Sequence, residues 1–273
     1  MALGLVAVLS IAGTLAYLQK QSGSKTNTFT GSAGLKLLLT ETQWDYDNNE
    51  TTLDDGSSSK EAAAYKPSTE YLKNPQLVNT ASFDKLTITT DATHDHEITA
   101  VAADDTNKYD EYVAMRIDFK GTTKTTAVTY SDILSVIEPI QFDTTNWKLI
   151  KAYTTTWVDV SNSDITTDSD SSGSVEKNEI ASNVLSAKSL IFAYKGDSAY
   201  RTLSKNTYTP ALYSSVKTLA TIPSTLGGNV STDKDFPTFN LVMSGAAVDT
   251  ASFTDVTDST IETSLLDLLK TAP

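Results

Sequence analysis

The sequence contains no cysteine and only two histidines. The absence of cysteine excludes disulfide scaffolds, thiolate metal sites, cysteine nucleophiles and thiol redox chemistry. Two histidines argue against a histidine-rich metal enzyme. Basic residues are scarce as well: the 273-residue chain has 21 Lys and Arg against 34 Asp and Glu, so its formal net charge is −13. This charge repels the phosphate backbone, and no nucleic-acid partner is expected.

The residues that are present favour β-structure. Threonine is abundant and is accompanied by 12 Tyr and 8 Phe, a composition typical of pleated, half-buried surfaces. The clearest alternation runs over residues 111–119, where Val113, Met115, Ile117 and Phe119 share one face that we expect in the core. Further strands are expected near residues 35–40, 86–89, 147–158, 187–194 and 238–248, and a short amphipathic helix over 260–270.

Many short strands separated by turn signals predict an all-β protein with a sandwich or jelly-roll arrangement. The sequence divides into an N-terminal segment of residues 1–16, an extension of residues 17–34 and a single β domain of residues 35–273. Acidic loops interrupt that domain. The most biased of them, residues 161–182, is predicted to be an acidic insertion.

Residues 1–16 predict an export signal. They carry no charge, are too short for a membrane span of about 20 residues, and end in a Thr-Leu-Ala triplet typical of a signal-peptidase site. Cleavage is expected between Ala16 and Tyr17, with signal peptidase as a transient partner and no stable membrane insertion afterwards. A buried N-terminal helix or a retained anchor is the alternative. An acidic, cysteine-free, exported chain is typical of a bacterial or archaeal cell surface.

The sharpest chemical motif is residues 168–179, DSDSSGSVEKNE, which fits a twelve-residue calcium loop. Gly173 stands at the sharp turn and Val175 at the apolar position. The predicted ligands are Asp168, Asp170, Ser172, Ser174, Glu176 and Glu179. The flanking segments lack long amphipathic helices, so a paired EF-hand is not expected. The alternative is a solvated Ser/Asp-rich insertion without an ion.

His94 and His96 form the second candidate, because two imidazoles at positions i and i+2 point the same way on a strand. Glu97 or Asp91 could complete a zinc or copper site with them. There is no H-E-x-x-H helix, and a catalytic zinc needs three protein ligands and a general base. A plain acidic loop is therefore the favoured interpretation, and no catalytic residues are predicted.

Several segments of the chain form a recognisable set. The first is GTLAYLQ, residues 13–19, followed by NTFTGSAGLKLLLTETQWD, residues 27–45. The others are KNPQLVNTASFDK (73–85), DEYVAMRIDF (110–119), TPALYSSVKTLATIP (209–223) and VMSGAAVDTASF (242–253). Together they resemble the TasA/camelysin family of exported bacterial proteins. The junction is similar to the site at which a SipW-type signal peptidase cleaves members of the family. In this chain an acidic insertion separates residues 73–85 from residues 110–119, whereas the corresponding segments are closer together in the family.

The resemblance implies a jelly-roll β-sandwich whose members build extracellular biofilm-matrix fibres. In such fibres the N-terminal segment released by cleavage adds as a strand to the neighbouring subunit. Here the donor would be residues 17–30, with Tyr17, Leu18 and Phe29 as anchors. The partners expected from this are further copies of the chain and other matrix components. An ordinary disordered N-terminus is the alternative.

The leading hypothesis is therefore a secreted, non-enzymatic fibre subunit, with calcium as its expected cofactor. One alternative is a monomeric, calcium-dependent surface adhesin. A second alternative is a secreted metalloprotease, because camelysin-like members of the family have been described as such.

Overall fold

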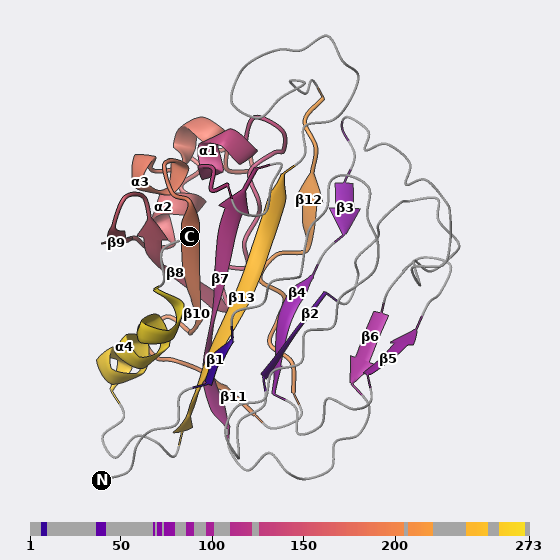
Figure 1. Ribbon diagram of the computed structural model, residues 1–273. Helices are drawn as coiled ribbons and strands as arrows, with labels where there is room; N and C mark the ends of the chain where they lie inside the picture. Colours follow the sequence, from indigo (N-terminus) through magenta and orange to yellow (C-terminus); the bar gives the residue numbers. More distant parts are fainter. Residues whose placement is uncertain are drawn as a thin grey trace.

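The computed structural model describes residues 7–9, 37–41, 68, 70–72, 74–79, 86–89, 97–100, 110–121, 126–204, 207–220, 239–250 and 257–270. Strands predominate among them, and all of the strand pairs are antiparallel (Figure 1). The all-β prediction is confirmed at this level.

Most of the strands belong to one seven-stranded sheet. Its order is β1-β13-β7-β10-β8-β9, and β11 pairs with β7. These strands are β1 (Ala7–Leu9), β7 (Glu111–Lys120), β8 (Trp147–Tyr153), β9 (Trp157–Asp159), β10 (Ser189–Tyr194), β11 (Thr202–Leu203) and β13 (Asn240–Asp249). The longest pairing joins β7 to β13 over ten residues, from Asn240 opposite Lys120 to Asp249 opposite Glu111. The strand and hairpin predictions for 111–119, 147–158, 187–194 and 238–248 are confirmed.

Three two-stranded sheets complete the described strands. They are β2 (Leu37–Glu41) with β4 (Pro75–Asn79), β3 (Glu70–Leu72) with β12 (Ser215–Lys217), and β5 (Leu86–Thr89) with β6 (Glu97–Ala100). Strand β6 begins at Glu97, directly after His94 and His96, where the sequence favoured a plain acidic loop.

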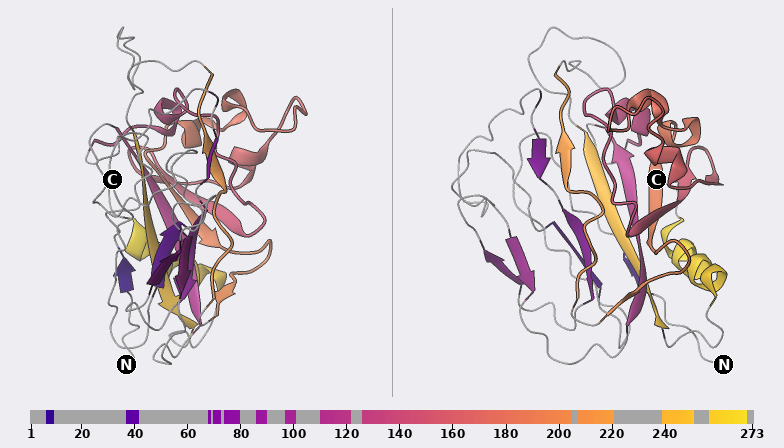
Figure 2. Two further views of the ribbon diagram at one scale, coloured as in Figure 1. Left: turned by 90° about the vertical axis from the view of Figure 1, so that its right-hand side faces the viewer. Right: turned by 180° about the vertical axis from the view of Figure 1, so that it is seen from behind.

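Helices occupy both ends of the large sheet. The short helices α1 (Tyr130–Ile133), α2 (Ser163–Thr166) and α3 (Ser182–Leu185) gather near one end, and α4 (Asp258–Leu269) lies near the other (Figures 1 and 2). Helix α4 begins after Thr257, whose side chain accepts a hydrogen bond from the Thr260 amide. The predicted C-terminal helix is therefore confirmed. No helix among the described residues has the length and apolar character that crossing a membrane requires.

Two apolar clusters lie on the two faces of β7. The larger one contains Val113, Met115, Ile117 and Phe119, the face that the alternation predicted to be core. Strands β2, β4 and β12 also contribute leucine and valine side chains to it. The second cluster contains Ala114 on the opposite face of β7, under the leucines of α4. Both faces of the strand are thus buried, whereas its alternation identified only one core face.

Candidate functional site

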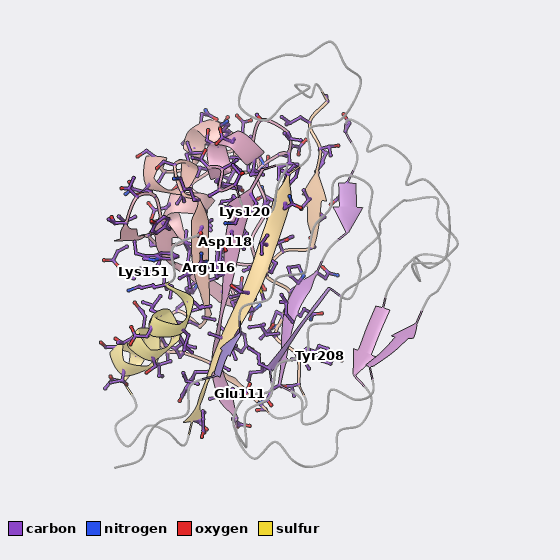
Figure 3. The ribbon with its side chains drawn as sticks, in the orientation of Figure 1. Glu111, Arg116, Asp118, Lys120, Lys151 and Tyr208 are labelled. Atoms are coloured by element: carbon purple, nitrogen blue, oxygen red, sulfur yellow. The ribbon has the colours of Figure 1, made fainter. Side chains whose placement is uncertain are left out.

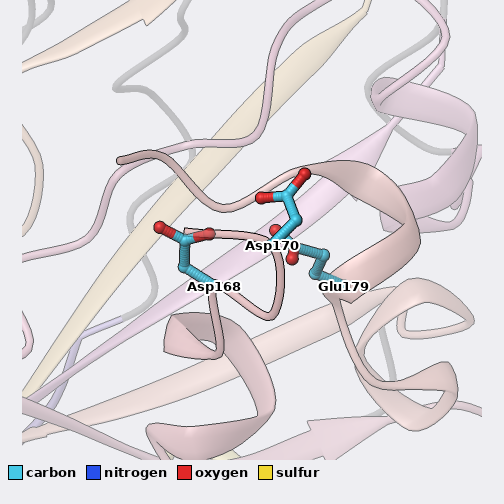
Figure 4. Close-up of side chains that lie close together, drawn as sticks. All are labelled: Asp168, Asp170 and Glu179. Carbon is cyan, nitrogen blue, oxygen red and sulfur yellow. The ribbon is translucent and has the colours of Figure 1, made fainter. Parts of the chain in front are cut away.

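The predicted calcium loop, residues 168–179, begins shortly after α2 and ends with the short 3₁₀ helix η1 (Lys177–Glu179) (Figure 4). The segments on either side of it are held by the body of the protein. Ile165 and Ile180 are buried in the larger cluster, and the Ala181 amide donates to the Asp164 carbonyl at 3.0 Å. The acidic insertion is consequently fixed to the body of the protein near both of its ends.

The first half of the loop is folded by its own carboxylates. One oxygen of Asp168 accepts from the Ser172 amide at 3.0 Å and the other from the Gly173 amide at 2.9 Å. The Ser172 amide also donates to Asp170 Oδ1 at 3.0 Å. Gly173 has a φ of +92°, a left-handed conformation that glycine adopts without steric cost. The hydrogen bonds to Asp168 and Asp170 and the left-handed conformation of Gly173 therefore form the sharp turn within the loop itself.

Glu179 closes the loop from its far end. Its Oε1 accepts from both the amide and the hydroxyl of Ser169 at 2.6 Å, and its Oε2 accepts from the Glu176 amide at 2.9 Å. These hydrogen bonds, above all those from the Glu176 amide and the Ser169 hydroxyl, lower the pKa of Glu179 to about 2. The carboxyl group is therefore ionised at neutral pH.

The three carboxylates converge. Asp168, Asp170 and Glu179 each offer one oxygen such that all three oxygens lie within 4.8 Å of one another (Figure 4). Calcium takes oxygen ligands at 2.3–2.6 Å, so oxygens around one ion lie at separations of up to roughly 5 Å. Lys177 is the only basic residue within residues 161–182, and its ammonium group donates to the Ser131 carbonyl at 2.7 Å. The arrangement suits a divalent, oxygen-preferring cation.

The other predicted ligands belong to the same loop, and the main-chain amides of Ser172 and Glu176 bond to carboxylates of the triad. The Ser172 hydroxyl donates to the Ser174 carbonyl at 2.9 Å, so these two groups are bonded to each other. Glu176 is not a member of the carboxylate group that converges. The structure thus brings together the carboxylates of Asp168, Asp170 and Glu179, and the assignment of Ser172, Ser174 and Glu176 as further ligands stays a prediction.

The remaining predicted sites fall wholly or partly outside the described residues. His94, His96 and Asp91 lie outside them, whereas Glu97 begins β6 opposite Thr89. The cleavage junction Ala16 and Tyr17 and the donor anchors Leu18 and Phe29 also lie outside.

The N-terminal segment nevertheless contributes one described element. Ala7, Val8 and Leu9 form β1, which pairs with Ala247, Ala246 and Gly245 of β13. These three residues belong to the predicted signal segment, where no strand was expected. Part of the segment expected to be removed therefore forms an edge strand of the large sheet.

Sequence reasoning also missed a buried polar network on β7 (Figure 3). The Arg116 guanidinium donates to Asp118 at 2.6 Å and to the Leu269 carbonyl at the end of α4 at 2.5 Å. Asp118 also accepts from the Ser189 hydroxyl, and Arg116 lies over the ring of Trp157 at 5.4 Å. The signal in the sequence was an arginine at an alternating position of an otherwise apolar strand. The network fixes the end of α4 to the sheet, so it is structural.

Comparison of the chain with protein-family models, with curated proteins and with solved structures found no match.

Proposed function

We propose that this chain is an exported, non-enzymatic structural subunit that polymerises into extracellular matrix or surface fibres. The signal segment is removed after Ala16, and the N-terminal segment of one copy adds as a strand to the next copy. The strands of the subunit adopt the jelly-roll β-sandwich that the resemblance to the TasA/camelysin family implies. Its partners are further copies of the chain and other matrix components.

The observation that carries this proposal is the pairing of the N-terminal segment with the large sheet. Strand β1 joins β13 through main-chain pairing at one edge of the sheet. An edge that accepts an extended segment from its own chain offers the same hydrogen-bonding groups to a segment from another copy. Such a head-to-tail contact does not close on itself, so it propagates a filament.

Electron microscopy of purified protein tests this function directly. Protein that starts at Tyr17 is compared with protein that retains residues 1–16, each with and without millimolar calcium. We expect filaments only from the cleaved form. The net charge of −13 opposes lateral bundling at low salt, and added cations should relieve that repulsion. Monodisperse particles in all four samples would contradict the proposal.

A second candidate function, a monomeric calcium-dependent binding module, is supported by the converging carboxylates of Asp168, Asp170 and Glu179. In either function we expect calcium to bind weakly, with a Kd on the order of 10⁻⁴ to 10⁻³ M. Saturating calcium should raise the melting temperature of the native chain by several degrees. A double substitution, Asp168→Ala with Glu179→Ala, should abolish that rise. An undiminished rise would show that calcium binds elsewhere.

A further inference from the structure

Strand β13 lies between β1 and β7 and has a stretch of small residues where β1 pairs with it. Gly245, Ala246 and Ala247 are consecutive, and they are the β13 residues that pair with β1. On the other side of the strand, all ten residues of β13 pair with β7. Within the described part of the chain, β1 thus covers three of the ten positions along the outer side of β13.

Side chains pack against both faces of β13 at the positions that pair with β1. On the core face, the side chains of Leu77 and Leu37 approach Gly245 so closely that an added Cβ would lie 2.7 Å from Leu77 and 3.3 Å from Leu37. On the opposite face, Ala246 belongs to the cluster formed with the leucines of α4. A strand that pairs with β13 here directs alternate side chains toward the Leu77 and Leu37 side and toward the α4 side.

Helix α4 contributes to the same site. It contacts β13 and also contacts β1. Its end is fixed to the sheet by the Arg116 hydrogen bond to the Leu269 carbonyl. An incoming strand therefore meets preformed surroundings, which reduces the ordering cost of binding.

We propose that the outer side of β13, centred on Gly245–Ala247, accepts residues 17–30 of a second copy, and that residues 7–9 of the same chain occupy it until residues 1–16 are removed. This inference rests on the proposed function and names its acceptor. Cleavage then does two things at once: it vacates the acceptor edge and frees the donor segment. Uncleaved chains remain blocked by their own N-terminus.

Hydrogen exchange of backbone amides, followed by mass spectrometry, tests the acceptor. Amide directions alternate along a strand, so some β13 amides point toward β7 and others toward the acceptor side. We expect the second group to exchange at least about tenfold faster in dilute protein that starts at Tyr17 than in protein with residues 1–16. Fragments covering β10, an interior strand, should exchange at equal rates in both.

A synthetic peptide of residues 17–30, added in excess to the dilute cleaved protein, should restore slow exchange in β13. A scrambled peptide of the same composition should not. A peptide in which L18A and F29A remove two anchors should need at least about tenfold more material. Protection in another strand, or no protection of β13 by the native peptide, would overturn the inference.

The outcomes separate this inference from the proposed function. Peptide protection of β13 without filaments from the cleaved protein supports the acceptor and counts against the fibre function. Filaments in which β13 exchanges as fast as in the dilute cleaved protein support fibres and overturn the acceptor.

Discussion

The central strands β7, β10 and β13 and the loop 168–179 are held together by opposite means. In the strands, side chains such as Ile117 and Phe192 are fully buried, and packing supplies the stability. In the loop, exposed carboxylates accept hydrogen bonds from main-chain amides, and Val175 is the one hydrophobic residue of the loop packed against the core. The free energy of unfolding should therefore depend on the apolar volume buried in the sheet, whereas the conformation of the loop should depend on the ionisation of its carboxylates.

The largest expected effect comes from removing a ring in the sheet. Phe192 is fully buried, with its ring centroid 4.6 Å from that of Phe142. Phe192→Ala should lower the free energy of unfolding by about 3–5 kcal/mol because it leaves a cavity in a packed core. Urea denaturation measures the loss. The exposed control Thr155→Ala, in the turn between β8 and β9, should change it by less than about 0.5 kcal/mol. Similar values for the two variants would contradict burial as the source of stability.

The Arg116–Asp118 pair tests whether burial also determines how much an ion pair contributes to stability. The Arg116 side chain is 4% exposed and is paired with Asp118. Arg116→Met should cost about 3 kcal/mol, because it leaves a largely buried carboxylate without its cation and releases the end of α4. The control is Lys151→Met, which removes an ion pair to the exposed Asp159 and should cost less than about 1 kcal/mol. Equal losses of unfolding free energy for the two variants in urea denaturation would show that burial does not determine the contribution of the ion pair.

Gly245 tests how tightly Leu77 of β4 and Leu37 of β2 pack against β13. Gly245→Ala should destabilise the protein by about 1–2 kcal/mol, because the new methyl group would meet Leu77 at 2.7 Å. In a Leu77→Ala background the same change should be neutral or stabilising, since alanine is favoured over glycine in a strand. A double-mutant cycle by urea denaturation should therefore give a coupling energy of about 1 kcal/mol or more. Additive effects would contradict this packing.

The smallest expected effect is the protonation of the loop. Hydrogen bonds from the Glu176 amide and the Ser169 hydroxyl lower the pKa of Glu179 to about 2, below the ordinary 4.5. A depressed folded-state pKa means that the contribution of Glu179 is complete above pH 4.5 and is lost as the pH falls toward 2. NMR shifts of the Ser169 and Glu176 amides should titrate with a midpoint near 2. Glu179→Gln should abolish the titration, and a midpoint near 4.5 would contradict the hydrogen bonds.

Local patterns in the sequence predicted much of the sheet. The alternation over 111–119 located β7 and its larger core face, and the leucine spacing near the C-terminus located α4. The spacing of Asp168, Asp170, Gly173 and Glu179 predicted the turn and the converging carboxylates, because each of these features depends on residues within a dozen positions. Ser172, Ser174 and Glu176 were assigned as ligands by their positions in the motif, and that assignment stays a prediction.

Long-range contacts were beyond such patterns. The burial of Ala114 depends on α4, which lies about 150 residues later in the sequence, and the role of Arg116 depends on the Leu269 carbonyl of that helix. The pairing of β1 with β13 joins segments from the two ends of the chain. An apolar, uncharged stretch predicts an export signal equally well whether or not it can also pair with a strand.

Composition, charge, the periodic strands and the local loop can be predicted from the chain alone, because they follow from neighbouring residues and backbone preferences. The face that α4 covers, the charges that are buried and the strand that β1 pairs with become visible only in the folded chain. Those features arise from segments brought together across the chain, and burial and main-chain pairing between such segments have no signature within any one of them.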